Sequence, residues 1–141
     1  MSIVAVTAAV STLLDAHPDL HVIQRGAAQP TSGAPVFLGL ATAGANEPDI
    51  YGTFTLSTPR VDNDRVSGDS GAGVYTLATM AVGRTPNEAA WVADRIDAAL
   101  TRRRPVVPGR RCSPIRKSSG SGTRYDDPKY IATDVWRFAI T

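Results

Sequence analysis

Apolar residues recur at helical spacing between Thr85 and Arg103, in the stretch TPNEAAWVADRIDAALTRR. Thr85 is a suitable N-cap, and Pro86 fits the first helical position because its missing N–H has no partner there anyway. Glu88 is placed to reach back to the Thr85 amide and complete a capping box. The sequence therefore predicts an amphipathic helix with a buried stripe that comprises Ala89, Val92, Ala93, Ile96, Ala99 and Leu100.

The end of this helix and one of its flanks carry arginines. Arg102 and Arg103 are expected in the last turn, where cations favour the helix dipole, and Pro105 then stops the helix. Trp91 lies beside the apolar stripe, on a flank that it shares with Arg95 and Arg102. Two interpretations stay open: Trp91 forms the margin of the core, or it anchors an oligomer interface together with Arg95 and Arg102.

The same patterns predict the other elements. A second amphipathic helix is expected over residues 3–15. Residues 50–57 alternate between apolar and polar side chains, which predicts a half-buried strand with one face toward solvent. Residues 74–82 are apolar on both faces and predict a central strand. Further strands are predicted at 20–24, 36–42 and 130–140, and a short one at 112–116.

Two stretches are poor in apolar residues and predict long polar loops, at 58–73 and 105–128. The second stretch contains the run SSGSG at 118–122, whose composition is typical of a flexible loop. Neither stretch has enough apolar side chains to offset the entropy of ordering its backbone. We therefore expect both loops to become ordered only against neighbouring molecules.

The elements fit one domain over residues 1–141. Two helices and about five or six strands, with mostly hairpin-length connections, predict an α+β fold. In this fold both helices pack on one face of a mostly antiparallel, mixed sheet. The pattern leaves the order of the strands open.

Composition narrows the class of protein. The chain has 43% hydrophobic and 20% charged residues, which is ordinary for a soluble globular protein. No apolar run approaches the roughly 20 residues of a membrane helix, so no membrane partner is expected. Cys112 is the single cysteine, which agrees with synthesis in a reducing cytoplasm. The apolar run at 3–14 has no Lys or Arg before it, so it is not expected to be a secretion signal.

Charge is unevenly distributed, although the net charge is only +2. Between Asp97 and Asp126 the chain carries eight basic residues and no acid, and this local field attracts anions. Three interpretations stay open: solvated surface, a protein-docking surface, or contact with nucleic acid, for which only Tyr125 is near enough to stack on bases. The residues of a docking surface would be Arg103, Arg104, Arg110, Arg111, Arg116 and Lys117.

The sequence contains partial motifs of catalysis and of metal binding, but the residues around them do not support either function. Gly68-Asp69-Ser70-Gly71 is similar to the nucleophile segment of trypsin-like proteases, but it lies in a polar loop of a chain too short for two barrels. We expect no catalytic residue, and hence no enzyme. Two groups of residues have ligand types for a metal: Asp15, His17, Asp19 and His21 for a divalent metal, and Asp62, Asp64 and Asp69 for calcium. For the first group a solvated turn is favoured over a metal site, and for the second a solvated loop.

The order of features resembles the tail terminator, or tail completion, proteins of long-tailed bacteriophages. The resemblance rests on the N-terminal helix that ends in HPDLHV, on a hydrophilic loop in mid-chain, and on VYTLATMAV leading into TPNEAAWVADRIDAAL. It continues in the basic segment VPGRRC and the closing DPKYIATDVWRFAIT. These motifs are patterns without invariant chemistry, and the last two thirds of the chain carry most of them.

The resemblance implies a structural virion protein without a cofactor, which agrees with the expectation of no catalytic or metal-binding residue. It would assemble in the host cytoplasm as a homo-hexameric ring on the head-proximal end of the tail tube. There it would stop tube polymerisation and offer a surface to the head–tail connector, while DNA passes through its lumen. The expected partners are its own copies, the major tail tube protein and the connector. The alternatives are a head–tail connector or neck completion protein and, third, a small nucleic-acid-binding module.

Overall fold

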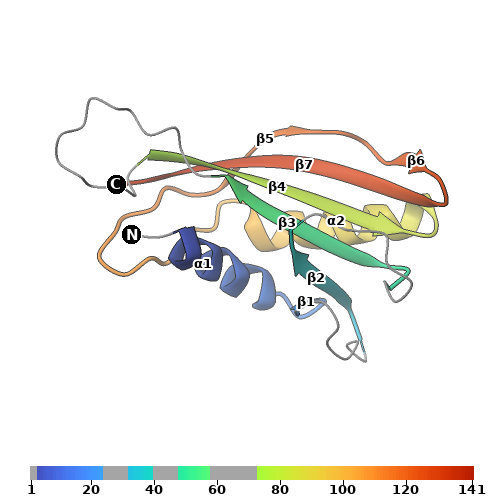
Figure 1. Ribbon diagram of the computed structural model, residues 1–141, viewed down its shortest axis with the longest axis horizontal. Coiled ribbons are helices and arrows are strands. Elements are labelled where there is room, and N and C mark those ends of the chain that lie inside the picture. The colour runs from blue at the N-terminus through green and yellow to red at the C-terminus, as the bar shows by residue number, and fades with distance from the viewer. Residues whose placement is uncertain (1–2, 24–31, 40–47, 58–72) are drawn as a thin grey trace.

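The computed structural model describes residues 3–23, 32–39, 48–57 and 73–141, and Figure 1 draws the rest in grey. The long strands β3, β4 and β7 run side by side, with both helices beneath them (Figure 1). In chain order the elements are α1 (Ile3–Asp15), β1 (Leu20–Val22), β2 (Ala34–Leu38), β3 (Tyr51–Ser57), β4 (Gly73–Gly83), α2 (Pro86–Leu100), β5 (Arg116–Gly120), β6 (Arg124–Asp126) and β7 (Lys129–Ile140).

The strands form one seven-stranded mixed sheet in the order β1-β2-β3-β4-β7-β5, with β6 also paired to β7. The pairs β1/β2 and β2/β3 are parallel, and all the other pairs are antiparallel. The predicted α+β class and the mixed, mostly antiparallel sheet are therefore confirmed. β7 is the last strand in the sequence, yet it lies inside the sheet.

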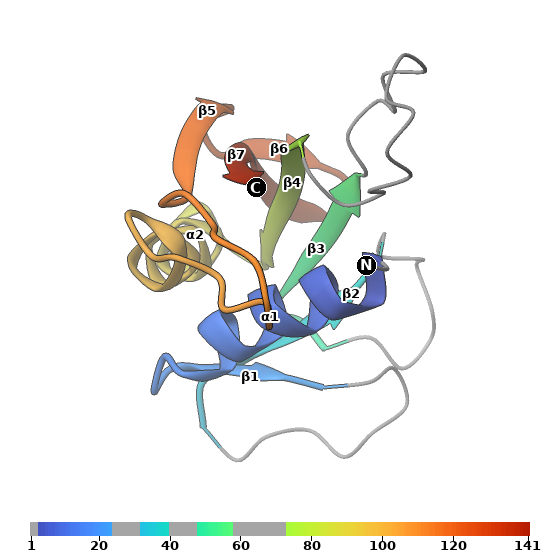
Figure 2. The same ribbon diagram turned by 90° about the vertical axis from the view of Figure 1, so that its left-hand side faces the viewer.

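The main core fills the space between the helices and one face of the sheet. Figure 2 shows α1 and α2 on the same side of β3, β4 and β7. Trp136 of β7 is fully buried there, and its Nε1 donates a hydrogen bond of 2.9 Å to Oγ1 of Thr79. This bond satisfies two polar groups that would otherwise be buried without partners. Side chains with 0% exposure in this core include Val6, Val10, Leu14, Phe54, Leu77, Val92 and Leu100.

Strand β3 is more buried than its alternating pattern predicts, so the expected solvent face is wrong. Thr53 and Tyr51, both on the polar side of the pattern, are 2% and 4% exposed. The reason is a second apolar cluster on the other face of the sheet, formed by Phe37, Tyr51, Val82 and Ile131. The rings of Phe37 and Tyr51 meet edge to face with centroids 5.9 Å apart.

Strand β4 is central, as predicted, because it pairs with β3 on one side and β7 on the other. Although its residues are apolar on both faces, only one face of β4 is buried near Val74 and Ala78. Tyr75 and Leu77 face the core, whereas Ala78 is exposed and Val74 is 54% exposed on the other face. No described helix covers that face at this end of the sheet (Figure 2).

The stretch 105–128 contains structure that its composition does not predict. The SSGSG run was expected to be a flexible loop, but its first half lies in β5, and β6 follows; both strands pair with β7. The strand expected at 112–116 is instead a single bridge between Cys112 and Ile140, and β5 begins at Arg116. The physical reason is non-local, because the 12-residue β7 offers a backbone edge on which even Ser and Gly residues find hydrogen bonds.

Helix α2 begins as predicted but is capped differently. The amide of Glu88 donates to Oγ1 of Thr85 over 3.2 Å, as an N-cap requires. The Glu88 carboxylate does not reach the Thr85 amide; it accepts from the Arg84 amide and from the Arg84 guanidinium, each over 3.2 Å. The loop predicted at 58–73 lies outside the described residues, except for Gly73, which begins β4.

Candidate interaction surfaces

Two of the three predicted interface residues lie together on one flank of α2. Trp91 and Arg95 are both half-buried, and the guanidinium carbon of Arg95 sits 5.2 Å from the centre of the Trp91 ring. Nε of Arg95 is 3.4 Å from Oδ2 of Asp19, which lies in the turn before β1. The flank thus presents an amphipathic aromatic ring beside a paired arginine, which is a composition typical of interface centres. We call Trp91 and Arg95 the α2 flank.

Arg102 does not lie on this flank, which corrects the predicted end of the helix. α2 ends at Leu100, Thr101 is its C-cap, and Arg102 has a left-handed backbone with φ of 61°. The amide of Arg102 donates to the carbonyl of Ile115 over 2.9 Å, and the amide of Ile115 donates to the carbonyl of Arg103 over 2.8 Å. These bonds turn the chain away from the helix and place Arg102 and Arg103 beside the start of β5.

The basic docking residues predicted from the sequence are spread over this region. Arg103, Arg104 and Arg116 are exposed, and they lie near one another because of the Ile115 bonds. Arg110 is half-buried near Tyr75. Burial raises the pKa of the Tyr75 hydroxyl, and the Arg110 charge only partly opposes this rise. Arg111 is exposed, and its backbone exchanges hydrogen bonds with Thr141 at the end of β7.

The ammonium group of Lys117 contacts carboxylates of the same chain. Its Nζ lies 2.6 Å from Oδ2 of Asp97 on α2 and 3.8 Å from Oδ1 of Asp134 on β7. The ammonium group also stands 5.1 Å from the centre of the Trp136 ring. We call Lys117, Asp97 and Asp134 the lysine clasp, since it fastens β5 to α2 and β7.

The electrostatics of the clasp differ between its two carboxylates. Burial raises the pKa of Asp134, and nearby Lys117 does not fully compensate. Burial also pushes the pKa of Asp97 up, but hydrogen bonds from Lys117 and Thr101 outweigh that effect and leave the pKa lowered. The hydrogen bond to Asp97 raises the pKa of Lys117. At neutral pH the clasp is therefore an ion pair between Lys117 and Asp97. The ionised form of Asp134 beside this pair is disfavoured by burial.

The sequence pattern does not predict the lysine clasp or the strand pairing around it. One local signal for β6 was present, because Tyr125 and Tyr130 flank the segment DDPK, which is a turn composition. In the structure these residues pair across β6 and β7, with ring centroids 5.1 Å apart. No local signal joins Lys117 to Asp97, which lies 20 positions earlier.

Among the residues weighed as metal ligands, Asp15, His17 and Asp19 have other partners, whereas Nε2 of His21 is buried without a hydrogen-bond partner. Nδ1 of His17 accepts from the Asp19 amide over 3.1 Å, and Oδ1 of Asp15 accepts from the Val22 amide over 3.2 Å. Within the described ranges no group of three His, Cys, Asp or Glu residues is arranged to hold a metal. The segment around Ser70 and the possible calcium ligands Asp62, Asp64 and Asp69 lie outside the described residues. No helix among the described residues has the length and apolar character needed to cross a membrane.

Comparisons with known proteins add a likeness of fold. No protein-family model matches the chain, and no curated protein matches its sequence. A chain from the virion of a native gene transfer agent particle has a similar structure, with a TM-score of 0.53 and 14% identity over 74% of this chain and 77% of that chain. A second solved structure, which carries no functional name, aligns with a TM-score of 0.59 and 15% identity over 100% of this chain and 96% of that chain. The chain therefore shares its fold with a component of a gene transfer agent virion.

Proposed function

We propose that this protein is a structural component of a virion. In this proposal the protein forms a hexameric ring that caps the head-proximal end of a tail tube. The observation that carries the proposal is the fold shared with a chain of the gene transfer agent virion. The sequence resemblance to tail terminators supports the more specific role. In that role the ring stops tube polymerisation, contacts the tube protein below it and offers its upper surface to the head–tail connector.

A closed ring needs two different faces on each subunit, because its interface is heterologous. The described residues offer two such faces on opposite sides of α2. Asp97 follows Arg95 by two positions, which is a rotation of about 200° around a helix. The side of α2 that bears the lysine clasp and β5 therefore points away from the α2 flank. One face of a subunit could thus meet the other face of its neighbour.

A structural role, rather than an enzymatic one, also agrees with the described ionisable groups. The shifted pKa values of Glu88 and Arg84 arise first from the hydrogen bond between them. The pKa of Lys117 is raised first by its hydrogen bond to Asp97, and the pKa of Asp134 is raised first by burial; both residues belong to the lysine clasp, which fastens one strand to its neighbours. Neither set brings a general base to a nucleophile, which catalysis by hydroxyl or thiol groups requires.

The test is deletion of the gene in the particle that encodes it, followed by electron microscopy of lysates. A terminator is expected to leave tubes of uncontrolled length without heads, and the purified protein should form rings on isolated tubes. Normal-length tails that lack heads would instead indicate a neck or connector protein. Normal particles would contradict both roles.

A further inference from the structure

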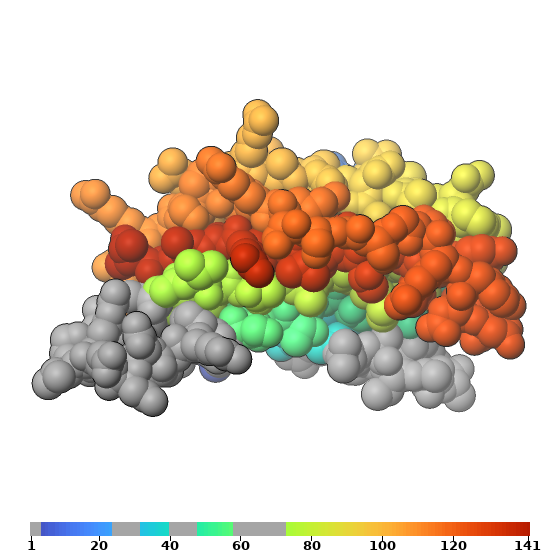
Figure 3. All heavy atoms as spheres, turned by 90° about the horizontal axis from the view of Figure 1, so that it is seen from above, coloured from blue at the N-terminus to red at the C-terminus, as the bar shows by residue number. Residues whose placement is uncertain are grey.

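Strand β5 ends the sheet on one side with an open backbone edge. All five of its residues are exposed, and among the described strands its only partner is β7. In Figures 1 and 2 no described element lies beyond it, and its orange atoms stand at the surface between β7 and α2 in Figure 3. An open edge of this kind is a template for another extended chain.

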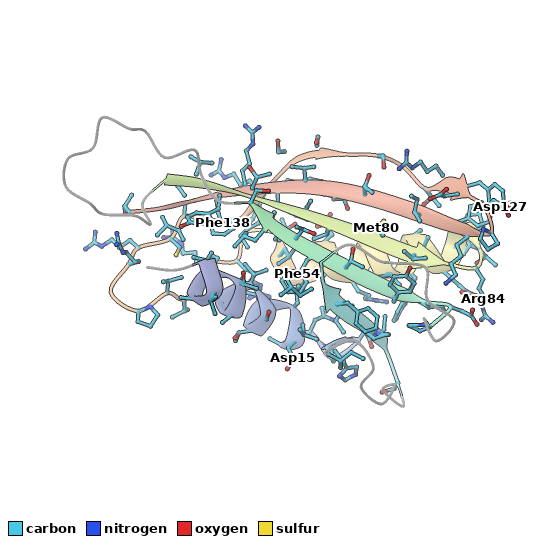
Figure 4. All side chains as sticks on the ribbon, in the orientation of Figure 1. Asp15, Phe54, Met80, Arg84, Asp127 and Phe138 are labelled. Atoms are coloured by element: carbon cyan, nitrogen blue, oxygen red, sulfur yellow. The ribbon has the colours of Figure 1, made fainter. Side chains whose placement is uncertain are left out.

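The opposite edge of the sheet, at β1, is closed by the chain itself. The Leu20 amide donates to the carbonyl of His17 over 3.2 Å, and the Val22 amide donates to Oδ1 of Asp15 over 3.2 Å. Figure 4 shows Asp15 at the end of α1, on the far side of the molecule from β5. The chain thus satisfies the backbone of one edge and leaves the other edge open.

Strand β5 lacks one of the devices that usually guard a sheet edge, which is an outward-pointing lysine. An edge lysine ordinarily projects outward and repels an incoming strand. Lys117 instead turns toward Asp97 and the Trp136 ring in the lysine clasp. Strand β5 keeps two other guarding devices, its short length and the bulge between Lys117 and Ser119.

One end of β5 carries a concentration of exposed arginines, which we call the arginine corner. The backbone bonds at Ile115 bring Arg102 and Arg103 beside Arg116, and Arg116 is the cross-strand partner of Arg137 on β7. Within the described part of the chain none of these arginines forms an ion pair with a carboxylate. The corner comprises Arg102, Arg103, Arg104, Arg116 and Arg137.

We propose that the open edge of β5 and the arginine corner together bind an extended, acidic segment of a partner protein, which joins the sheet as an additional strand. The backbone edge would supply the alignment of the segment, and the arginine forks would pair with its carboxylates. This inference goes beyond the ring proposal, because it depends only on the sheet edge and its arginines.

The observations favour a protein segment over nucleic acid. Phosphates would suit the arginines equally well, but a nucleic acid has no peptide groups to pair with the edge of β5. Single-stranded nucleic acid also binds by stacking its bases on aromatic rings. The exposed aromatic side chain of this region, Tyr125, pairs with Tyr130 at the other end of β7 from Arg137.

The test uses the full chain and two fluorescent peptides of about eight residues, a common strand length. Both peptides alternate Asp or Glu with Thr or Val, and the second carries N-methyl groups on alternate amides, which block strand pairing. Fluorescence anisotropy should show binding of the first peptide and binding weaker by about tenfold or more for the second. Amide exchange at residues 116–120 should slow when the first peptide binds.

A double variant, Arg102→Glu with Arg116→Glu, should weaken binding of the first peptide by about tenfold or more, because it reverses two charges of the corner. The matched control is Arg111→Glu with Arg124→Glu, which changes the net charge equally at exposed sites outside the corner and should stay within about threefold. Circular dichroism verifies that each variant is folded.

Three results would overturn the proposal. One is the absence of peptide binding up to about millimolar concentration, where even weak strand addition is measurable. Another is equal binding of the two peptides, which would leave only charge attraction. The third is tighter binding of a short DNA duplex, lost in the Arg102→Glu, Arg116→Glu variant, which would assign the corner to nucleic acid. None of these results depends on ring formation.

Discussion

The ammonium group of Lys117 on β5 lies 2.6 Å from the carboxylate of Asp97 on α2. This ion pair holds the edge strand, which consists of exposed residues, against helix α2, whose apolar face is buried in the core. Thr101 donates a hydrogen bond of 2.6 Å to the same carboxylate, so the C-terminal end of α2 is tied into the clasp as well. The position of the arginine corner therefore depends on the lysine clasp.

Replacement of Lys117 by Met should lower the free energy of unfolding by about 1 kcal/mol, because it removes a partly exposed ion pair and a cation–π contact but keeps the aliphatic chain. Urea denaturation measures the effect. In a double-mutant cycle with Asp97→Asn we expect a coupling of roughly 0.5 kcal/mol. Arg116→Met is the control, since Arg116 has no ion-pair partner among the described residues. Zero coupling would show that the pair contributes nothing.

Asp97 and Asp134 should give opposite dependences of stability on pH. The pKa of Asp97 is lowered in the folded state, so its contribution is present above the ordinary aspartate pKa of about 3.9 and is lost as the pH falls below it. The pKa of Asp134 is raised by burial, so its ionisation costs stability as the pH rises from that ordinary value through the raised one. Lys117 and Asp94 are the other charges that act on this cluster.

Thermal unfolding between about pH 3 and 7 tests this difference, since the interval includes the ordinary aspartate pKa of about 3.9, from which the two folded-state pKa values depart in opposite directions. Asp97→Asn should lower the melting temperature at neutral pH and lose its effect in acid. Asp134→Asn should raise the melting temperature at neutral pH and lose its effect in acid. Parallel shifts of both variants at all pH values would contradict the assignment.

Gly83 should not tolerate a side chain, because a Cβ there would lie 2.5 Å from the amide nitrogen of Ala89 and 2.7 Å from Cβ of Glu88. Gly83→Ala would push the start of α2 away from β4, and we expect a loss of roughly 1–3 kcal/mol, as for overpacking in a core. Gly122→Ala is the matched control, since nothing lies within 4 Å of its added Cβ. Equal stabilities of the two variants in urea would mean that α2 shifts without cost.

A substitution at Trp91 tests the proposal that the protein forms a ring. Trp91→Ala should cost about 1–2 kcal/mol of folding free energy, less than for a fully buried tryptophan, because the side chain is half-buried. It should nevertheless prevent ring formation on isolated tubes, as seen by electron microscopy. Tyr125→Ala removes an aromatic ring that is 59% exposed on β6 and should leave rings unchanged. Normal rings from the Trp91 variant would remove the α2 flank from the interface.

The sequence predicts best where the signals are local. Thr85 and Pro86 determine where α2 begins, and the apolar spacing after them determines which face is buried. The end of α2 is not predicted from local sequence. Arg102 has a left-handed backbone and donates its amide hydrogen bond to Ile115, which lies 13 positions later. In the candidate site, helical spacing alone predicts that Trp91 and Arg95 share one flank of the helix. Their contact in the structure confirms this prediction.

Composition fails where partners come from distant parts of the chain. Ser118 and Ser119 have the composition of a loop, but they lie in a strand because β7 presents its edge to them. Thr53 is polar by pattern, yet it lies in the sheet beside Phe37 of β2 and is buried. In both places pairing in the sheet decides the structure, and no window of sequence around the residue contains the partner.

The place of β7 inside the sheet bears on the order of events during synthesis. β5 and β6 precede β7 in the chain, and among the described strands they pair only with it. Neither strand can therefore form before the ribosome has made β7. β4 can pair with β3 earlier, but its pairing with β7 spans a separation of more than 45 positions, which makes this pairing a slow, late event of folding. A nascent or truncated chain consequently lacks the edge at β5, so premature association through that edge is avoided until folding is complete.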